Sequence, residues 1–335
     1  MKKAFNNYKI FFVDILVWLY IILTTYYSFF VAPSGNEFEF APNQYYLYII
    51  ASCLITFSAH FIPNASIGRR VFHIGLKDGA KIYKYIFIYI FLITIATGWQ
   101  ITQVSLKDFF STDGLSAAGR IFSALVTPEF KIFPRVIGAA VETIYMAFMA
   151  TIIGIPVAFL LSFFAASNVM KGFLGKTVYT LLRAFLNISR SIEPLVWAII
   201  FSVWVGIGPF AGMLALSIHS IASLAKLYSE SIETIDVGPL EAIQSTGAHG
   251  ILVVWYGIVP QVILPFISFT VYRWDINVRM ATVIGLVGGG GLGSILMQYQ
   301  GLAKWHEVGL IILVITCIVW AMDYASSFIR KEVSK

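Results

Sequence analysis

The chain has 335 residues, of which 59% are hydrophobic and 12% are charged, and its formal net charge is +6. A soluble globular domain is about half apolar and about a quarter charged, so this composition excludes an ordinary soluble protein. The apolar residues fall in runs of about 20, the length at which a helix crosses a bilayer core. Because the basic residues cluster in short connections between these runs, the positive charge indicates membrane topology rather than nucleic-acid binding.

The apolar runs predict an all-α membrane protein with about eight transmembrane helices. The predicted spans are 10–32, 45–62, 84–101, 136–166, 190–207, 209–228, 262–290 and 306–328. The first run follows three lysines and has no clear small-residue cleavage site, so an uncleaved span is expected rather than a signal peptide. Cys53 and Cys317 lie inside apolar runs, without disulfide or metal spacing, and are predicted to be small buried hydrophobes.

Lysine and arginine in the loops predict the orientation of the spans. Loop 33–44 has neither and carries Glu37 and Glu39. Basic residues follow the second, fourth and eighth spans, at Arg69, Arg70, Lys77, Lys81, Lys84, Lys171, Lys176, Arg330, Lys331 and Lys335. Both termini are therefore predicted to be cytoplasmic. Segment 102–135 is predicted to be external, with an interfacial amphipathic helix at 114–126.

A long polar stretch, 229–260, separates the sixth and seventh predicted spans. Gly238 and Pro239 are expected to interrupt regular structure before Leu240. The residues from Glu241 to Gly247 then fit a short surface helix that ends in a glycine. A transporter driven by a separate ATPase needs a rigid feature of this kind, because force must pass from the cytosolic subunit to the spans. The pattern therefore predicts a cytoplasmic coupling helix.

This stretch resembles the coupling loop of ABC importer permeases. That family carries Glu-Ala-Ala, three residues, Gly, nine residues and then Ile-x-Leu-Pro. The positions in register here are Glu241, Ala242, Gly247 and Pro260. Three positions depart from the pattern, with Ile243 for the second Ala, Gly257 for Ile and Val259 for Leu. The resemblance implies that the residues from Glu241 to Gly247 couple the spans to an ATPase.

Two segments, 204–232 and 259–294, resemble the phosphonate-type (PhnE-like) permeases of the same family. The shared features are Gly206–Gly212, Pro260–Gln261, Leu264–Pro265, Tyr272–Arg273, Asn277–Arg279 and Gly285–Gly293. The similarity covers about 136–330 and implies a five-helix, MetI-like type I importer core there. Residues 1–135 add little family signal and are predicted to form a three-span extension with an extracytoplasmic segment.

The resemblance implies the permease subunit of an ATP-driven importer in a bacterial inner membrane, with phosphonate or a related phosphorus oxyanion as its cargo. The implied partners are a second permease copy, a cytoplasmic ATPase dimer that binds ATP and magnesium, and an extracytoplasmic substrate-binding protein. The chain itself is expected to be no enzyme and to hold no cofactor. Phosphite, phosphate or a methionine-type amino acid stays open as the cargo.

Two other classes of function are disfavoured. An ion-coupled secondary transporter often has paired broken helices, whereas only one broken segment, 285–293, is visible here. A membrane enzyme would need a cluster of titratable groups in the spans, and neither a catalytic set nor metal-ligand spacing is present.

Two motifs resemble nucleotide-binding fingerprints. Gly288, Gly290 and Gly293 have dinucleotide-motif spacing, but they end a span instead of following a strand. Segment 171–177 is a near miss to a P-loop, because Met170 stands where glycine is required. Neither is predicted to bind nucleotide. Four glycines are predicted either to line a gate of the translocation path or to let two helices pack closely, namely Gly288, Gly289, Gly290 and Gly291.

Polar residues of the seventh span are candidate pathway residues, because intramembrane charges are costly and usually functional. They are Arg273, Asp275, Asn277 and Arg279. Asp275 and Arg279 can pair on one helix face, and an arginine fork matches phosphonate oxygens. Arg279 is predicted to lie on the exit path, so its replacement by Lys or Ala should impair uptake and leave assembly intact. The alternative is a snorkelling pair near the cytoplasmic side.

Five further polar residues receive simpler interpretations. Glu142 is predicted to lie at the N-terminus of its own helix, where the helix dipole favours a carboxylate. Arg183, Arg190 and Glu193 are assigned to the cytoplasmic socket around the coupling helix. His219, alone in the sixth span, is predicted to be a buried residue with satisfied hydrogen bonds.

Overall fold

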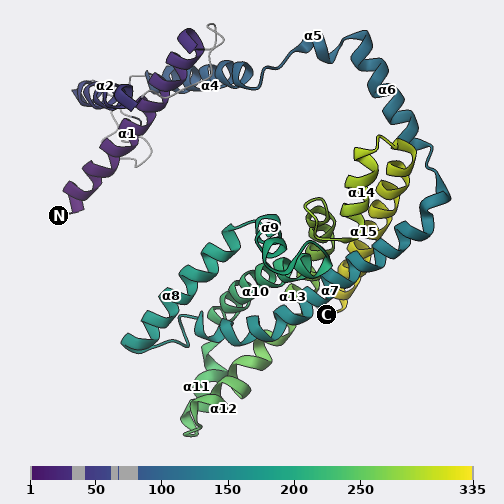
Figure 1. Cartoon of the computed structure of the whole chain (residues 1–335). Coiled ribbons are helices and arrows are strands. Elements are labelled where there is room, and N and C mark those ends of the chain that lie inside the picture. Colours follow the sequence, from purple (N-terminus) through teal and green to yellow (C-terminus); the bar gives the residue numbers. More distant parts are fainter. Residues whose placement is uncertain (1, 32–41, 62–66, 68–81, 334–335) are drawn as a thin grey trace. The chain divides into compact units, whose positions relative to one another are not determined.

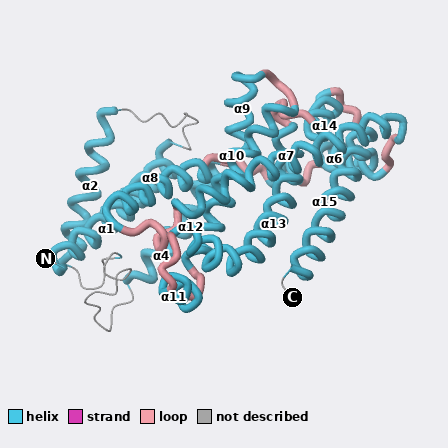
Figure 2. Tube along the Cα trace, turned by 90° about the horizontal axis from the view of Figure 1, so that it is seen from below, coloured by secondary structure: helices cyan, strands magenta, loops and turns pink. Residues whose placement is uncertain are grey.

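The computed structural model describes residues 2–31, 42–61, 67 and 82–333, which form helices without any strand (Figure 1). Figure 2 shows the helices of residues 82–333 joined by short loops. The prediction of an all-α protein is confirmed. The contacts divide the chain into two compact units, Met1–Leu115 and Ser116–Lys335. Loop 33–41 and the basic residues from Arg69 to Lys81 lie outside the described residues.

The described residues of the first unit include four helices and one π-helical turn. They are α1 (Lys2–Tyr26), η1 (Tyr27–Val31), α2 (Pro42–Phe61), α4 (Ile82–Ile101) and α5 (Leu106–Phe109). Hydrogen bonds between side-chain hydroxyl groups join α1 to α4, between Tyr20 and Thr94 at 2.6 Å and between Thr25 and Tyr89 at 2.9 Å. Many large apolar side chains of α4 are exposed, as expected of a helix that contacts lipid.

The second unit holds most of the chain and is built around three long helices. Its helices are α7 (Phe133–Phe164), α8 (Gly172–Ser191), α9 (Pro194–Val205), α10 (Pro209–Glu233), α11 (Val237–Ser245), α12 (Gly250–Val253), α13 (Val259–Gly285), α14 (Gly291–Gly301) and α15 (Trp305–Val333), with η3 (Phe130–Ile132) and η4 (Val254–Ile258) as shorter turns. Helix α6 (Thr112–Val126) leads into this unit and confirms the helix predicted at 114–126.

Helices α7, α10 and α13 pack against one another through small residues. Ala147, Ala150, Ala211, Ala215 and Ala281 are fully buried in one cluster, and such residues let membrane helices approach closely. A second cluster, near α11, contains larger side chains that include the stacked rings of Tyr228 and Phe266. Figure 1 shows α11 and α12 at one end of the unit and α14 at the other. We refer to these as the α11 end and the α14 end.

Six helical segments among the described residues are long and apolar enough to cross a membrane. They are Lys9–Phe29, Lys84–Ile101, Phe130–Phe164, Pro209–Glu233, Gly250–Gly285 and Trp305–Val333. Helices α8 and α9 would form a seventh span, bent by 90°, and α2 contains the shorter apolar stretch Tyr46–Phe57. Six of the about eight predicted spans therefore correspond to these segments. The two predicted spans that do not are 45–62 and 190–207.

Helix α8 is the main element that hydrophobic patterning did not identify. The predicted span 190–207 contains only the 12-residue α9, and the 20-residue α8 precedes it. One face of α8 is polar and packs towards α10, where Asn187 accepts a hydrogen bond from Lys226 at 3.3 Å. This polar face interrupts any continuous apolar run, which explains why the sequence does not predict the helix.

Candidate functional site

The predicted coupling helix is present as α11 at the end of the second unit. The Asp236 carboxylate caps its start by accepting a hydrogen bond from the N–H of Gly238 at 3.1 Å. Gly247 adopts a φ of +76°, the left-handed conformation that ends many helices. No residue of α11 is buried, and Glu241 and Ala242 are exposed. The helix therefore presents a free surface, while its other side contacts the spans.

Two of the three departures from the family pattern lie in direct contact. A carbon added at Gly257 would lie 3.5 Å from Cδ1 of Ile243 and 3.3 Å from Cδ1 of Leu240. Gly257 is buried in the π-helical turn η4, immediately before α13. Compared with the family pattern, the chain thus carries a larger residue on α11, Ile243 in place of alanine, and no side chain opposite it, where Gly257 replaces isoleucine. We infer that these two departures compensate each other in volume.

This contact predicts a non-additive pair of substitutions. Gly257→Ile should overpack the contact and destabilise the protein by about 1–3 kcal/mol. Adding Ile243→Ala should restore most of the loss, because it removes volume where the new side chain needs it. Melting temperatures of the purified single and double variants measure the coupling. Val259→Leu, the third departure, is the matched control and should change stability little; additive effects of the pair would contradict the inference.

The side chain of Gln261 ties the start of α11 to the start of α13. Its Oε1 accepts a hydrogen bond from the N–H of Asp236 at 3.0 Å. Its Nε2 donates to the backbone oxygen of Gly257 at 2.7 Å and to that of Asp236 at 3.3 Å. A displacement of α11 therefore acts directly on the first turn of α13.

An ion pair connects the same end of the unit to α8. Nη1 of Arg183 lies 2.7 Å from Oε1 of Glu233, in the last turn of α10. The same carboxylate oxygen accepts a hydrogen bond from the N–H of Ser167 at 2.8 Å. Of the residues assigned to the socket, Arg183 thus lies beside the polar stretch 229–260 that contains α11. Arg190 and Glu193 lie nearer the break between α8 and α9.

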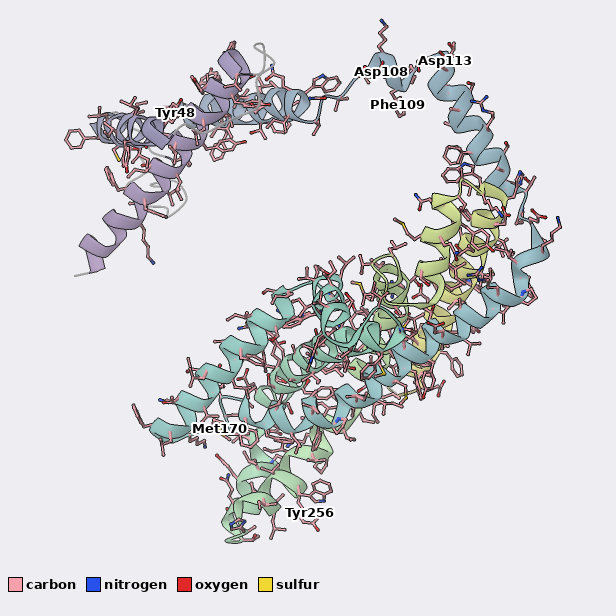
Figure 3. All side chains as sticks on the ribbon, viewed as in Figure 1. Tyr48, Asp108, Phe109, Asp113, Met170 and Tyr256 are labelled. Atoms are coloured by element: carbon pink, nitrogen blue, oxygen red, sulfur yellow. The ribbon has the colours of Figure 1, made fainter. Side chains whose placement is uncertain are left out.

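A recess of about 730 Å³ opens at the α11 end, lined in part by Met170. Figure 3 labels Met170 and Tyr256 at this end.

A glycine-rich turn at the α14 end joins α13 to α14. Gly288, Gly290 and Gly291 have φ of +91°, +78° and +66°, which favour glycine. A carbon added at Gly212 on α10 would lie 2.7 Å from the backbone oxygen of Gly289. The predicted helix break is confirmed, and the close approach agrees with the packing interpretation; a role in gating stays a prediction.

Residues of α7 cap the first turn of α14. Oε1 of Glu142 accepts a hydrogen bond from the N–H of Gly291 at 2.9 Å, and Oγ1 of Thr143 accepts one from the N–H of Leu292 at 2.8 Å. The prediction placed Glu142 at the N-terminus of its own helix, but it lies well inside α7. The carboxylate does face a helix N-terminus, although that terminus belongs to α14.

A buried polar cluster joins α7, α10 and α13. Nδ2 of Asn277 donates to Oγ1 of Thr151 at 2.9 Å and to Oγ of Ser220 at 2.8 Å. Nε of Arg273 also donates to Oγ of Ser220, at 3.3 Å. The neighbouring His219 was predicted to have satisfied hydrogen bonds, but its Nδ1 is buried without a partner. The hydroxyl groups of Ser220 and Thr151 have no distinctive sequence pattern, so sequence reasoning missed them.

A separate charged cluster joins α13 to α15. Arg279 pairs with Asp275 as the spacing predicted, and its Nη2 also lies 3.3 Å from Oδ1 of Asp323. The side chain of Asp275 is 4% exposed, whereas that of Arg279 is 47% exposed. The four candidate polar residues of the seventh span thus form two groups, Arg273 with Asn277 and Asp275 with Arg279. The glycine-rich turn between α13 and α14 is separate from both groups and is the third set of residues predicted for the pathway or gate.

A helical membrane unit whose spans are tied to an exposed helix between two of them is the architecture of a transport component. The family model described as binding-protein-dependent transport system inner membrane component matches residues 132–334. The chain belongs to this family.

Relatives and solved structures agree with this family. The chain is 33% identical over 71% of its length to a putative phosphite transport system permease protein HtxC of Stutzerimonas stutzeri, of which it covers 83%. It is 31% identical over 72% of its length to the phosphite transport system permease protein PtxC of the same organism, of which it covers 86%. The fold is similar to a structure of the MetNI methionine ABC transporter, with a TM-score of 0.54 and 22% identity, covering 62% of this chain and 100% of that one.

Proposed function

We propose that this chain is the permease subunit of an ABC importer and forms the membrane path for a small phosphorus oxyanion, such as phosphonate or phosphite. The single observation that carries the transport mechanism is the exposed helix α11, which Gln261 holds against α13. The names of the two phosphite-system relatives support the class of cargo. Probable D-methionine permeases are more distant, at 26% identity over 53% of the chain in Pasteurella multocida, so they support an amino acid less well.

The proposed partners follow from this assignment. A cytoplasmic ATPase pair would grip α11 on two copies of the permease, and an extracytoplasmic binding protein would deliver the oxyanion to the α14 end. The α11 end and both termini would then face the cytoplasm of a bacterial cell. ATP and magnesium would bind to the ATPase, and the permease would perform no covalent chemistry.

In the proposed mechanism, α11 transmits movement to the spans along two routes. Closure of the ATPase pair would displace α11, and the hydrogen bonds of Gln261 would pass this displacement to α13. The ion pair between Arg183 and Glu233 would carry α8 along with the end of α10. The spans would then alternate between two arrangements, and nucleotide binding would change their relative populations.

Reconstituted transport tests the proposal. The permease would be purified with its ATPase and binding protein, placed in liposomes, and supplied with ATP and labelled methylphosphonate, phosphite, phosphate or methionine. ATP-dependent uptake of a phosphorus oxyanion is the expected result. Uptake of methionine alone would contradict the proposed cargo, and uptake without the ATPase would contradict the proposed class.

Substitution of Gln261 should separate ATP hydrolysis from transport. Gln261→Ala removes all three hydrogen bonds of this side chain, two to Asp236 at the start of α11 and one to Gly257 in η4, and each stabilises its contact by about 1 kcal/mol. We expect transport per ATP hydrolysed to fall by about tenfold, while hydrolysis continues. Gln261→Glu keeps the acceptor for Asp236 and should have an intermediate effect. Gln300→Ala, at an exposed position of α14, is the control, and an unchanged transport ratio for Gln261→Ala would contradict this route.

A further inference from the structure

Arg273 is buried in the spans, and no carboxylate of the described residues pairs with it. The residue is 6% exposed, and its Nη2 has no hydrogen-bond partner. Its one hydrogen bond to a side chain runs from Nε to the neutral Oγ of Ser220. The ion pairs of the described residues do not include Arg273. Arg279, six residues further along α13, has two carboxylate partners instead.

An unpaired buried guanidinium is costly. Arginine does not lose its proton in proteins, so it cannot avoid the cost by becoming neutral. Burial of a charge is tolerated when an opposite charge and hydrogen bonds compensate for lost hydration. Ionisable residues in membrane spans are accordingly rare and mark ion or substrate pathways. The position of Arg273 therefore indicates an anion that is bound during part of the protein's working cycle.

The surroundings of Arg273 offer further hydrogen-bonding groups. His219 precedes Ser220 on α10, and its Nδ1 is buried and unpartnered. The His219 ring lies near enough to Arg273 for the guanidinium charge to act on it. A hydroxyl, an imidazole and a guanidinium thus meet where α10 faces α13. Such a set suits an anion with several oxygens, because the guanidinium fork can donate to two of them at once.

We propose that Arg273, together with Ser220 and His219, binds the transported phosphorus oxyanion within the spans. This inference rests on the proposed function and specifies where the cargo is held. The guanidinium donates from two nitrogens to two oxygens of the anion, and the Ser220 hydroxyl donates to a third. Because Nη2 is buried and inaccessible to solvent in this structure, the anion reaches it when the side chains between α10 and α13 rearrange during the transport cycle.

Uptake by the reconstituted complex tests the site. Arg273→Gln and Arg273→Met should reduce ATP-dependent uptake of methylphosphonate by about 10- to 100-fold, the effect of losing charge-assisted hydrogen bonds. Arg273→Lys keeps the charge without the fork and should retain part of the uptake. Arg120→Gln, at an exposed position of α6, is the control. Wild-type uptake by Arg273→Met would overturn the site, whereas failure of the wild-type complex to take up any phosphorus oxyanion would overturn the proposed function itself.

Thermal stability provides a second measurement, which distinguishes an anion-binding role of Arg273 from a purely structural one. Arg273→Met removes an uncompensated charge, so the purified permease should melt at the same temperature as wild type or higher. Millimolar methylphosphonate should raise the melting temperature of wild type and not that of the variant. A lower melting temperature for Arg273→Met, with no response of wild type to the anion, would overturn the proposal and would point to a protein carboxylate as the partner.

Discussion

Gly293→Ala should severely destabilise the permease, although alanine forms helices better than glycine. Gly293 lies in the first turn of α14, and a carbon added there would lie 2.0 Å from the backbone oxygen of Thr282 and 2.8 Å from Cα of Gly285. Both neighbours are backbone atoms of α13 and cannot turn aside as a side chain can. We expect a loss of about 3 kcal/mol or more, because overpacking against backbone outweighs the gain of about 1 kcal/mol in helix propensity.

The same helix offers a matched control for Gly293→Ala. Nothing lies within 4 Å of a carbon added at Gly301, the last residue of α14. Gly301→Ala should therefore leave the melting temperature of the detergent-purified permease nearly unchanged, whereas Gly293→Ala should lower it sharply and reduce the monodisperse fraction in size-exclusion chromatography. Equal melting temperatures for the two variants would show that α13 and α14 do not approach as closely as described.

Arg279→Ala should cost about 3 kcal/mol of stability, because it leaves a buried carboxylate without its partner. Asp275 is 4% exposed, and its other oxygen, Oδ1, already lacks a hydrogen bond. The sequence-based expectation was impaired uptake with intact assembly. The ion pair changes this expectation, since the packing of α13 against α15 should weaken as well. Denaturation of the purified permease, followed by the fluorescence of its tryptophans, measures the loss.

Two companion variants separate the loss of the pair from the loss of the arginine. Arg279→Met combined with Asp275→Asn removes both charges and should recover most of the stability, because the cost comes from the unpaired carboxylate. Asp323→Asn should cost less than about 1 kcal/mol, since that side chain is 51% exposed. If Arg279→Ala proves no less stable than the double variant, the buried pair is not what stabilises this contact.

Patterning and resemblance predicted the all-α fold, the position of the coupling helix and the break at the glycine-rich segment. These features have local causes that a sequence displays. Polar residues between two apolar runs cannot span a membrane, and consecutive glycines destabilise a helix. The pairing of Asp275 with Arg279 was predictable for the same reason, because their spacing alone places them on one face. The break predicted at Gly238 and Pro239 was wrong, because both residues lie in the first turn of α11, where proline is tolerated.

The remaining features depend on contacts between distant segments. Gln261 is one of many polar residues in the sequence, and only its distances to Asp236 and Gly257 reveal a link between helices. Glu142 caps a helix that begins about 150 residues later, which no local rule can predict. The burial of Arg273 without a partner for Nη2, and the contact of Arg279 with Asp323, likewise depend on tertiary positions that the sequence does not display.

The 90° bend between α8 and α9 has a consequence for leakage through the membrane. Helix α8 is anchored near the last turn of α10 through Arg183, whereas α9 packs beside the first half of α10 through Ala198 and Phe201. A straight helix would transmit a tilt along its whole length. In the proposed mechanism, the bend would let one end of the translocation path open while the other end stays closed, so a continuous opening through which ions could escape would not form.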